Sequence, residues 1–236
     1  MRYMATSKER LTQTLILEAA VGLADEHGLE AFTMRKLADV LGTAPMTLYH
    51  HIPSKEAIID GIVELVFAEI ELPPEDLDWK TAIRRRCVSA RAVLNRHPWA
   101  APLMESGPSP GPANLRHHDA VIGCLRRGGL SIALTAHAYA VLDSFIYGFA
   151  FEEATLPGAG AGEDLPKAAA EIAASMPFDE YPHLAELAIE HVLQPGYDFG
   201  DSFEFGLDLI IEGIDQASRH QRARTDDDSE LAVWLL

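Results

Sequence analysis

The side chains with the clearest potential for intermolecular contact form a short run in the first quarter of the chain. Pro45, Met46 and the methyl group of Thr47 can press on the methyl groups of thymine bases. The hydroxyl of Thr47 can serve a base or a phosphate, and the polar tips of Tyr49 and His51 suit phosphate oxygens. The run therefore has the chemistry of a surface that contacts double-stranded DNA.

Cations beside this run favour the same interpretation. Arg35 can reach a base edge or a phosphate, and Lys55 is better suited to a phosphate. The net charge of −17 is unusual for a DNA-binding protein, but residues 1–60 hold six Lys or Arg against eight Asp or Glu, so most of the acidity lies elsewhere. The candidate DNA-contacting residues are Arg35, Pro45, Met46, Thr47, Tyr49, His50, His51 and Lys55.

Two short helices joined by a glycine turn must position these side chains. Thr33 is expected to cap the first helix, which ends at Gly42, and Thr43 is expected to cap the second. The residues expected to face the core are Leu37, Val40, Leu41, Ala44, Leu48 and Ile52. This layout is that of a helix-turn-helix, whose second helix lies in the major groove of DNA.

Helical spacing of hydrophobic residues continues along most of the chain, and no run alternates as a hairpin would. The fold class is therefore predicted to be all-α. A first helix ends before Gly28, and its inner face is expected to consist of Leu11, Leu15, Ala19 and Leu23. Further helices are expected at residues 54–71, 79–97, 114–127, 130–151, 181–193 and 198–220.

Several short motifs in residues 8–65 occur together with this helix-turn-helix. They are AA at 19–20, HG at 27–28, FTMRKLA at 32–38, LG at 41–42, TLYHHI at 47–52 and SK at 54–55. With these motifs the segment resembles the DNA-binding part of the tetracycline-repressor (TetR) family of bacterial transcriptional regulators.

The resemblance implies a homodimer that binds a palindromic operator, usually represses transcription, and is released by a small molecule. We expect three segments: a DNA-binding domain at 1–55, a ligand-binding and dimerisation domain at 56–220, and a flexible tail at 221–236. An activator, a ligand-independent regulator, and a small-molecule-binding protein with a vestigial DNA-binding motif remain alternatives.

Residues 205–213, FGLDLIIEG, resemble the last helix of the branch that contains the tetracycline repressor itself. In that branch, a histidine after the fifth helix can coordinate a metal-chelated drug. Residues 101–107 contain no histidine, and Met104 falls near that place. We therefore expect no metal or other cofactor, and an effector that is not a magnesium–tetracycline complex.

Apolar residues near the carboxy-terminus and in the segment 134–152 form stripes suited to close helix packing across a twofold axis. The alternative is a core within one chain. The candidate dimer-interface residues are Val141, Phe145, Gly148, Phe203, Leu207, Ile210 and Ile214.

An abundance of aromatic residues permits a largely apolar effector pocket with few polar anchors. The alternative is that these aromatics are ordinary core residues, that His97 is a helix-end residue and that Glu152 is an exposed charge. The candidate ligand-binding residues are His97, Trp99, Met104, Tyr139, Ser144, Phe145, Tyr147, Phe149 and Glu152.

Other chemistry finds little support in the chain. His117, His118 and Asp119 are adjacent, so on a helix they point to different sides, and we expect them at the surface rather than on one metal ion. Cys87 and Cys124 lie far apart and are expected to be buried reduced thiols. No catalytic arrangement is recognisable, so we expect a protein that is not an enzyme.

The segment 130–151 is long enough to span a bilayer and carries one formal charge, Asp143. His137 and Asp143 inside it favour a helix buried in a bundle, so no membrane association is expected. The start of the chain, MRYMATSKER, lacks the apolar stretch of a secretory signal, and the expected localisation is cytoplasmic.

Overall fold

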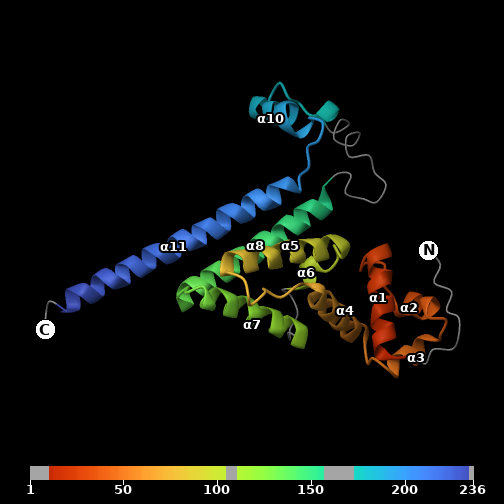
Figure 1. The fold of residues 1–236 in the computed structure, drawn as a ribbon. Helices are drawn as coiled ribbons and strands as arrows, with labels where there is room; N and C mark the ends of the chain where they lie inside the picture. Colours follow the sequence, from red (N-terminus) through yellow and green to blue (C-terminus); the bar gives the residue numbers. More distant parts are fainter. Residues whose placement is uncertain (1–10, 105–110, 157–172, 234–236) are drawn as a thin grey trace. The chain divides into compact units, whose positions relative to one another are not determined.

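The computed structural model describes residues 11–104, 111–156 and 173–233, with side chains described as far as Ala223 in the last range. Every regular element within these ranges is a helix, which confirms the predicted all-α fold (Figure 1). In chain order they are α1 (Gln13–His27), α2 (Met34–Val40), α3 (Pro45–Tyr49), α4 (Lys55–Glu69), α5 (Trp79–Arg96), α6 (Ala101–Met104), α7 (Pro112–Arg127), α8 (Ile132–Thr155), α10 (Pro182–Leu187), the π-helical turn η1 (Ala188–Val192) and α11 (Asp201–Val233).

The chain divides into two compact units, to which α5 and α7 both contribute. Unit 1 comprises Met1–Leu72 and Ala92–Ala120, and unit 2 comprises Pro73–Arg91 and Val121–Leu236. The division into a DNA-binding domain, a ligand-binding domain and a tail stays a prediction.

Side-chain oxygens begin three of the first four helices. Thr12, Thr33 and Ser54 each accept a hydrogen bond from the backbone N–H three residues later, at 3.1–3.2 Å. Such caps satisfy N–H groups that have no partner inside the helix. The predicted cap at Thr33 is confirmed, but α3 is capped at Ala44 rather than Thr43 and without a side-chain hydrogen bond.

Helix α1 packs on α2 and α4 through a face that differs from the predicted one. Its buried residues are Ile16, Ala20, Leu23 and Ala24. The predicted face was Leu11, Leu15, Ala19 and Leu23, of which only the last is buried and the others are half-buried. A strict four-residue repeat rotates by about 40° per step around an α-helix, so it cannot follow one straight face.

The inner faces of α2 and α3 are narrower than predicted. Leu37, Leu48 and Ile52 are at most 1% exposed, as expected for anchors of the helix pair. Val40 is 60% exposed and Ala44 is also exposed, which corrects their assignment to the core. Each helix has only five to seven residues, so it has room for one buried edge.

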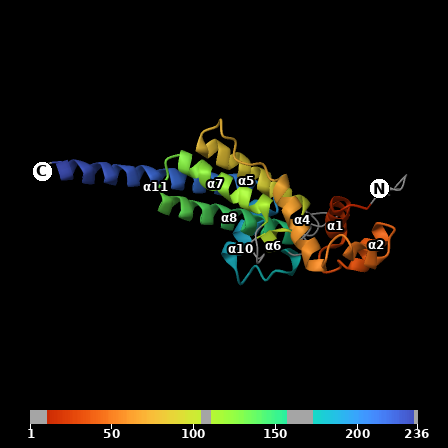
Figure 2. The same ribbon diagram turned by 90° about the horizontal axis from the view of Figure 1, so that it is seen from below.

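In unit 2, helices α8 and α11 lie side by side (Figures 1 and 2). Phe145 stacks on Phe203 with ring centroids 5.2 Å apart, and Phe149 stacks on Phe199 at 4.8 Å. Further along α11, Leu207 is fully buried. Aromatic pairs of this kind add to the apolar burial that joins the two helices.

Helix α8 is long and apolar enough, by length and composition alone, to cross a membrane. In the chain it packs on α11, and its Asp143 forms a buried ion pair with Arg86 of α5, with 2.9 Å between Oδ1 and Nη1. A buried ion pair on a helix that packs within the chain supports the expected core helix.

The last elements differ from expectation at their ends. The helix predicted at 181–193 is present as α10 followed by η1. Helix α11 begins at Asp201 and continues to Val233, whereas it was expected to end near His220. Helix formation therefore extends into the segment predicted to be a tail.

Candidate nucleic-acid interface

The turn between α2 and α3 fixes the direction of the second helix. Gly42 has a φ of +63°, in the left-handed region that glycine adopts without a steric penalty. The next N–H, of Thr43, donates to the carbonyl oxygen of Ala38 at 2.9 Å. Pro45 then occupies the first turn of α3, where the missing N–H costs no helical hydrogen bond.

The outward face of α3 carries most of the predicted DNA-contacting residues. Met46 is 68% exposed and Tyr49 is 42% exposed, although both side chains are large and partly apolar. The accompanying side chains are exposed at Pro45, His50 and His51 and half-buried at Thr47. A short helix that buries Leu48 and leaves the opposite side free is suited to enter a groove.

The two predicted cations differ in their environment. Arg35, at the start of α2, is exposed and free to extend. Lys55 is half-buried, and its Nζ donates to the carbonyl oxygen of Phe32 at 3.0 Å while lying 5.7 Å from the centre of that ring. Lys55 thus joins the start of α4 to the turn before α2. This contact uses one of its three donors, so a phosphate contact by Lys55 stays a prediction.

Helix α4 is held within unit 1 at two further places. A Cβ atom at Gly61 would come within 2.7 Å of Leu17 Cδ2, so α4 approaches α1 closely there. The carboxylate of Glu64 accepts hydrogen bonds from the backbone N–H groups of Ala113, at 2.7 Å, and Asn114, at 3.2 Å. Glu64 therefore caps the first turn of α7 from another helix.

Two predicted effector-binding residues join α1 to the end of α5. His97 places Nδ1 at 2.7 Å from Asp25 Oδ1 and Nε2 at 3.3 Å from Glu69 Oε2. The indole N–H of Trp99 donates to the same oxygen of Asp25 at 2.7 Å. Met104 is buried in the same unit. The sequence did not indicate this bridging role, and an effector contact by these residues stays a prediction.

The adjacent histidines of α7 are not both at the surface as predicted. His117 is 1% exposed, and the rings of His117 and His118 lie 6.0 and 6.1 Å from that of Phe67. The burial of His117 corrects its expected surface position, whereas His118 is half-buried and Asp119 is exposed. Among the described residues, no group of three His, Cys, Asp or Glu could hold a metal ion.

The remaining effector-binding candidates all belong to α8 in unit 2 and differ in exposure. Ser144 and Glu152 are exposed, whereas Phe149 is buried. The other three, Tyr139, Phe145 and Tyr147, are half-buried. Phe145 packs on Phe203 of α11, and Phe149 packs on the same ring and on Phe199 just before α11, which matches the alternative that these aromatics are core residues.

Two buried charged residues of unit 2, Arg86 and Asp143, were not among the predicted site residues. Arg86 and Asp143 are 1% and 3% exposed at their side chains, and their contact is an ion pair rather than an aligned hydrogen bond. Burial is the largest single influence on the pKa of Arg86 and lowers it, but the charge of Asp143 together with smaller effects of Cys87 and Tyr147 outweighs burial, so the net pKa of Arg86 is raised. Asp143 is the one charged residue in an apolar run, and this could have indicated a buried ion pair, because a buried charge requires a partner.

On α11, most of the residues predicted to form the dimer face are buried within their own chain. Phe203, Leu207 and Ile214 are at most 8% exposed because they pack within their own chain, as the alternative interpretation held, while Ile210 is half-buried. The free face of α11 instead carries Phe205 and Leu209, which are 67% and 61% exposed. On α8, Val141 and Gly148 are exposed as a dimer face would require, and Phe145 is half-buried.

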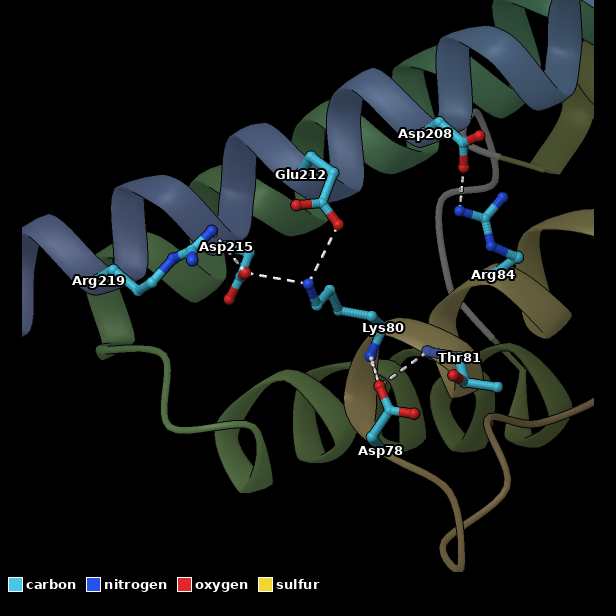
Figure 3. Close-up of polar contacts among 8 residues, drawn as sticks. All are labelled: Asp78, Lys80, Thr81, Arg84, Asp208, Glu212, Asp215 and Arg219. Atoms are coloured by element: carbon cyan, nitrogen blue, oxygen red, sulfur yellow. Dashed lines mark hydrogen bonds and ion pairs between the residues drawn. The ribbon is translucent and has the colours of Figure 1, made fainter.

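A ladder of ion pairs joins α5 to the flank of α11 (Figure 3). Lys80 Nζ lies 3.0 Å from Asp215 Oδ2 and 3.1 Å from Glu212 Oε1, and Arg84 pairs with Asp208 and Glu204. Hydrogen bonding to Asp215, then to Glu212, raises the pKa of Lys80, and the Lys80 contact lowers the pKa of Asp215. The ladder thus joins two helices of unit 2 along their facing flanks.

Two family models match separate segments of the chain. A family described as "Bacterial regulatory proteins, tetR family" matches residues 16–62, and one described as "Tetracyclin repressor-like, C-terminal domain" matches residues 72–218. The HTH-type transcriptional repressor DrrR1 of Streptomyces coeruleorubidus is 30% identical over 227 residues, covering 92% of this chain and 82% of the relative. The class A tetracycline repressor protein from transposon 1721 of Escherichia coli is 28% identical over 208 residues, covering 87% and 91% of the two chains.

Solved structures agree with these relatives. The TetR family protein ActR of Streptomyces coelicolor, in complex with actinorhodin, matches with a TM-score of 0.70 and 29% identity, covering 89% of this chain and 99% of that chain. Its ligand-free form matches with a TM-score of 0.72 and 28% identity, covering 91% and 100%. The chain therefore belongs to the tetracycline-repressor family of bacterial regulatory proteins.

Proposed function

We propose that this chain is a ligand-responsive transcriptional repressor that binds a palindromic operator as a homodimer. The outward face of α3 carries this proposal, because Met46 and Tyr49 are exposed on a helix whose other side is anchored in a core. Large side chains exposed in this way on a helix-turn-helix indicate a binding surface rather than a vestigial motif.

Each exposed side chain has a separate role at the operator. Pro45 and Met46 contact thymine methyl groups, and Thr47 contacts a base or a phosphate. Tyr49 and His51 contact phosphates, and with Arg35 they set the register of the protein on DNA. Lys55 and His50 complete the contact set. A base-edge contact of good geometry discriminates by about 1–3 kcal/mol.

The effector is a small and largely apolar molecule. Two observations support this: ActR, a relative of this chain, was solved with actinorhodin, and α8 carries half-buried Tyr139 and Tyr147 outside the phenylalanine stack, together with exposed Ser144 and Glu152. Residues 101–107 contain no histidine, which argues against a magnesium-chelated tetracycline as the effector.

Release from DNA follows from a change in the separation of the two recognition helices. In the DNA-bound dimer the two copies of α3 lie about 34–36 Å apart, which matches successive major grooves. Switching from nearly all bound to nearly all free requires the effector to prefer the second state by about 10⁴-fold, or about 5.5 kcal/mol. Helix α4 transmits this change, because it begins directly after α3 and is held to α1 and α7.

The remaining assignments follow from the same function. The dimer forms through the exposed faces of α8 and α11, the protein acts in the cytoplasm, and it does not catalyse a reaction. The relative DrrR1 is described as a repressor, which favours repression over activation.

A gel-shift experiment tests the function. The purified full chain is titrated onto fragments from upstream of its own gene and onto a genome-wide fragment pool, at low and high salt with competitor DNA. We expect a discrete complex that weakens steeply with salt, because phosphate contacts release counterions. Tyr49→Ala should abolish that complex, and Tyr181→Ala, at another exposed tyrosine, should not. A failure to bind any fragment would contradict the proposal.

A further inference from the structure

Two ion pairs join α5 to α8 in unit 2, and they differ in how well their carboxylates are satisfied. Arg91 forms a two-pronged contact with Glu153, in which Nε donates to Oε2 at 2.9 Å and Nη2 donates to Oε1. The side chains of this pair are 22% and 20% exposed, so water also reaches them. The carboxylate of Glu153 therefore needs no further donor.

The carboxylate of Asp143, in the second pair, is buried and lacks hydrogen-bond donors. Its Oδ1 lies 2.9 Å from Nη1 of Arg86, but within the described part of the chain neither oxygen of Asp143 accepts an aligned hydrogen bond. An ionised carboxylate can accept up to about four hydrogen bonds. A buried ion pair is favourable only when further hydrogen bonds satisfy its remaining atoms. Asp143 is thus able to accept a donor from a bound molecule.

The neighbours of Asp143 along α8 are apolar or aromatic. Leu142 and Ile146 are fully buried. Tyr139 and Tyr147, one helical turn before and one helical turn after Asp143, are half-buried. A molecule that reaches the carboxylate would therefore meet tyrosine rings and otherwise little polar surface on this helix.

The charges of the buried pair limit the kind of molecule that fits. Arg86 and Asp143 balance each other in apolar surroundings, so a ligand with a net charge would leave one charge uncompensated. A carboxylate ligand would also repel Asp143. A hydroxyl group donates a hydrogen bond without bringing a net charge, whereas a methyl ether has no proton to donate.

We infer that Asp143, held by Arg86, is the polar anchor of the effector site and accepts a hydrogen bond from a hydroxyl group of an uncharged aromatic effector. Tyr139 and Tyr147 contact the rings of that effector. The inference rests on the proposed effector-responsive function and adds to it two anchor residues and the chemical class of the effector. An ordered water molecule on Asp143 is the alternative, and it would give no preference among ligands.

Equilibrium dialysis of the full chain against matched compounds tests this inference without knowledge of the operator. The compounds are β-naphthol, its methyl ether and β-naphthoate, together with the hydroxy, methoxy and carboxylate derivatives of fluorene. We expect the hydroxyl member of at least one series to bind about tenfold or more tightly than its methyl ether and its carboxylate. The reason is that a site built to hydrogen-bond a hydroxyl group discriminates against an analogue that lacks it.

Removing the anchor should remove this preference. In the double variant Arg86→Met and Asp143→Leu, the ratio of the dissociation constants of methyl ether and hydroxyl compound should fall below about twofold. The matched control combines Arg91→Gln with Glu153→Gln, which removes the other ion pair between the same two helices and should keep the preference. Urea unfolding establishes that each variant is folded before dialysis.

Three outcomes would overturn the inference: equal binding of hydroxyl compounds and methyl ethers, no binding of any hydroxyl compound, or a preference that persists in the Arg86→Met and Asp143→Leu variant. The comparison on the unmodified chain decides the matter even if that variant does not fold. A chain that binds no DNA fragment in the gel-shift experiment would instead refute the proposed function, whatever the dialysis shows.

Discussion

The α1–α4 segment and the α8–α11 pair are both helical, but their helices are positioned by different signals. In the first, side-chain caps at Thr12, Thr33 and Ser54 begin the helices, and each short helix has one buried edge. In the second, α8 is apolar on most sides, and a buried ion pair together with stacked phenylalanines aligns it. Local signals therefore specify the first region, and contacts between distant residues specify the second.

The largest expected effect comes from the buried ion pair of unit 2. Asp143→Leu leaves the buried guanidinium of Arg86 without its carboxylate and should lower the free energy of unfolding by about 3–5 kcal/mol. Arg86→Met combined with Asp143→Leu should recover most of this loss. Urea unfolding at one fixed protein concentration measures both. Arg127→Gln, which breaks the exposed pair with Glu75, is the control and should change stability by less than about 0.5 kcal/mol.

Two glycines, one on α11 and one on α1, differ in the space around them. A Cβ atom at Gly206 would lie 2.7 Å from Phe145 Cζ, so Gly206→Ala should displace that ring and cost about 1–3 kcal/mol. At Gly22 of α1 an added Cβ atom would meet no side chain or neighbouring segment within 4 Å, so Gly22→Ala should instead stabilise by up to about 1 kcal/mol. Thermal unfolding of both variants measures the two changes in stability. Equal changes would contradict the expected difference in packing around the two glycines.

The caps of unit 1 offer a smaller test. Thr33→Ala removes the hydrogen bond to the third N–H of α2 and should cost about 1 kcal/mol, with weaker operator binding because α2 then frays. Thr43→Ala should have little effect on stability, because α3 is capped at Ala44 instead. Chemical unfolding of the two variants at equal concentration measures the difference. A larger loss of stability in Thr43→Ala than in Thr33→Ala would instead support Thr43 as the cap of α3, as predicted from the sequence.

The surface ladder should give the smallest effect and a definite pH dependence. The pKa of Asp215 is lowered by its contact with Lys80, so the pair stabilises the fold above the unfolded pKa of Asp215. This stabilisation is lost as the pH falls through the lowered value. Lys80→Met should therefore be less stable than the unmodified chain at neutral pH and equal to it in strong acid. Urea unfolding of both proteins from pH 7 to pH 2 measures the difference, and a constant gap would contradict the assignment.

Much of the DNA-binding region could be predicted from the sequence because its signals are local. Thr33, Gly42 and Pro45 each determine the backbone within a few residues, and the pattern of Leu48 and Ile52 assigns the faces of α3. The errors there, as at Val40, arose where a four-residue repeat or a short helix left the inner face ambiguous.

The α8–α11 region was less predictable because apolar residues lie on more than one side of each helix. The stripe with Phe203 and Leu207 and the stripe with Phe205 and Leu209 both repeat at helical spacing, and the sequence does not tell which one packs in the chain. The partner of Asp143 is 57 residues away along the chain, at Arg86, and no local pattern identifies it.

The carboxylate of Glu64 has a consequence for how motion of α4 would be detected. It caps the first turn of α7 by accepting the N–H groups of Ala113 and Asn114. If α4 shifts, these two amides lose their acceptor together, because both depend on one side chain. Their rates of hydrogen exchange with solvent thus report the position of α4, from a place on the chain about 50 residues away.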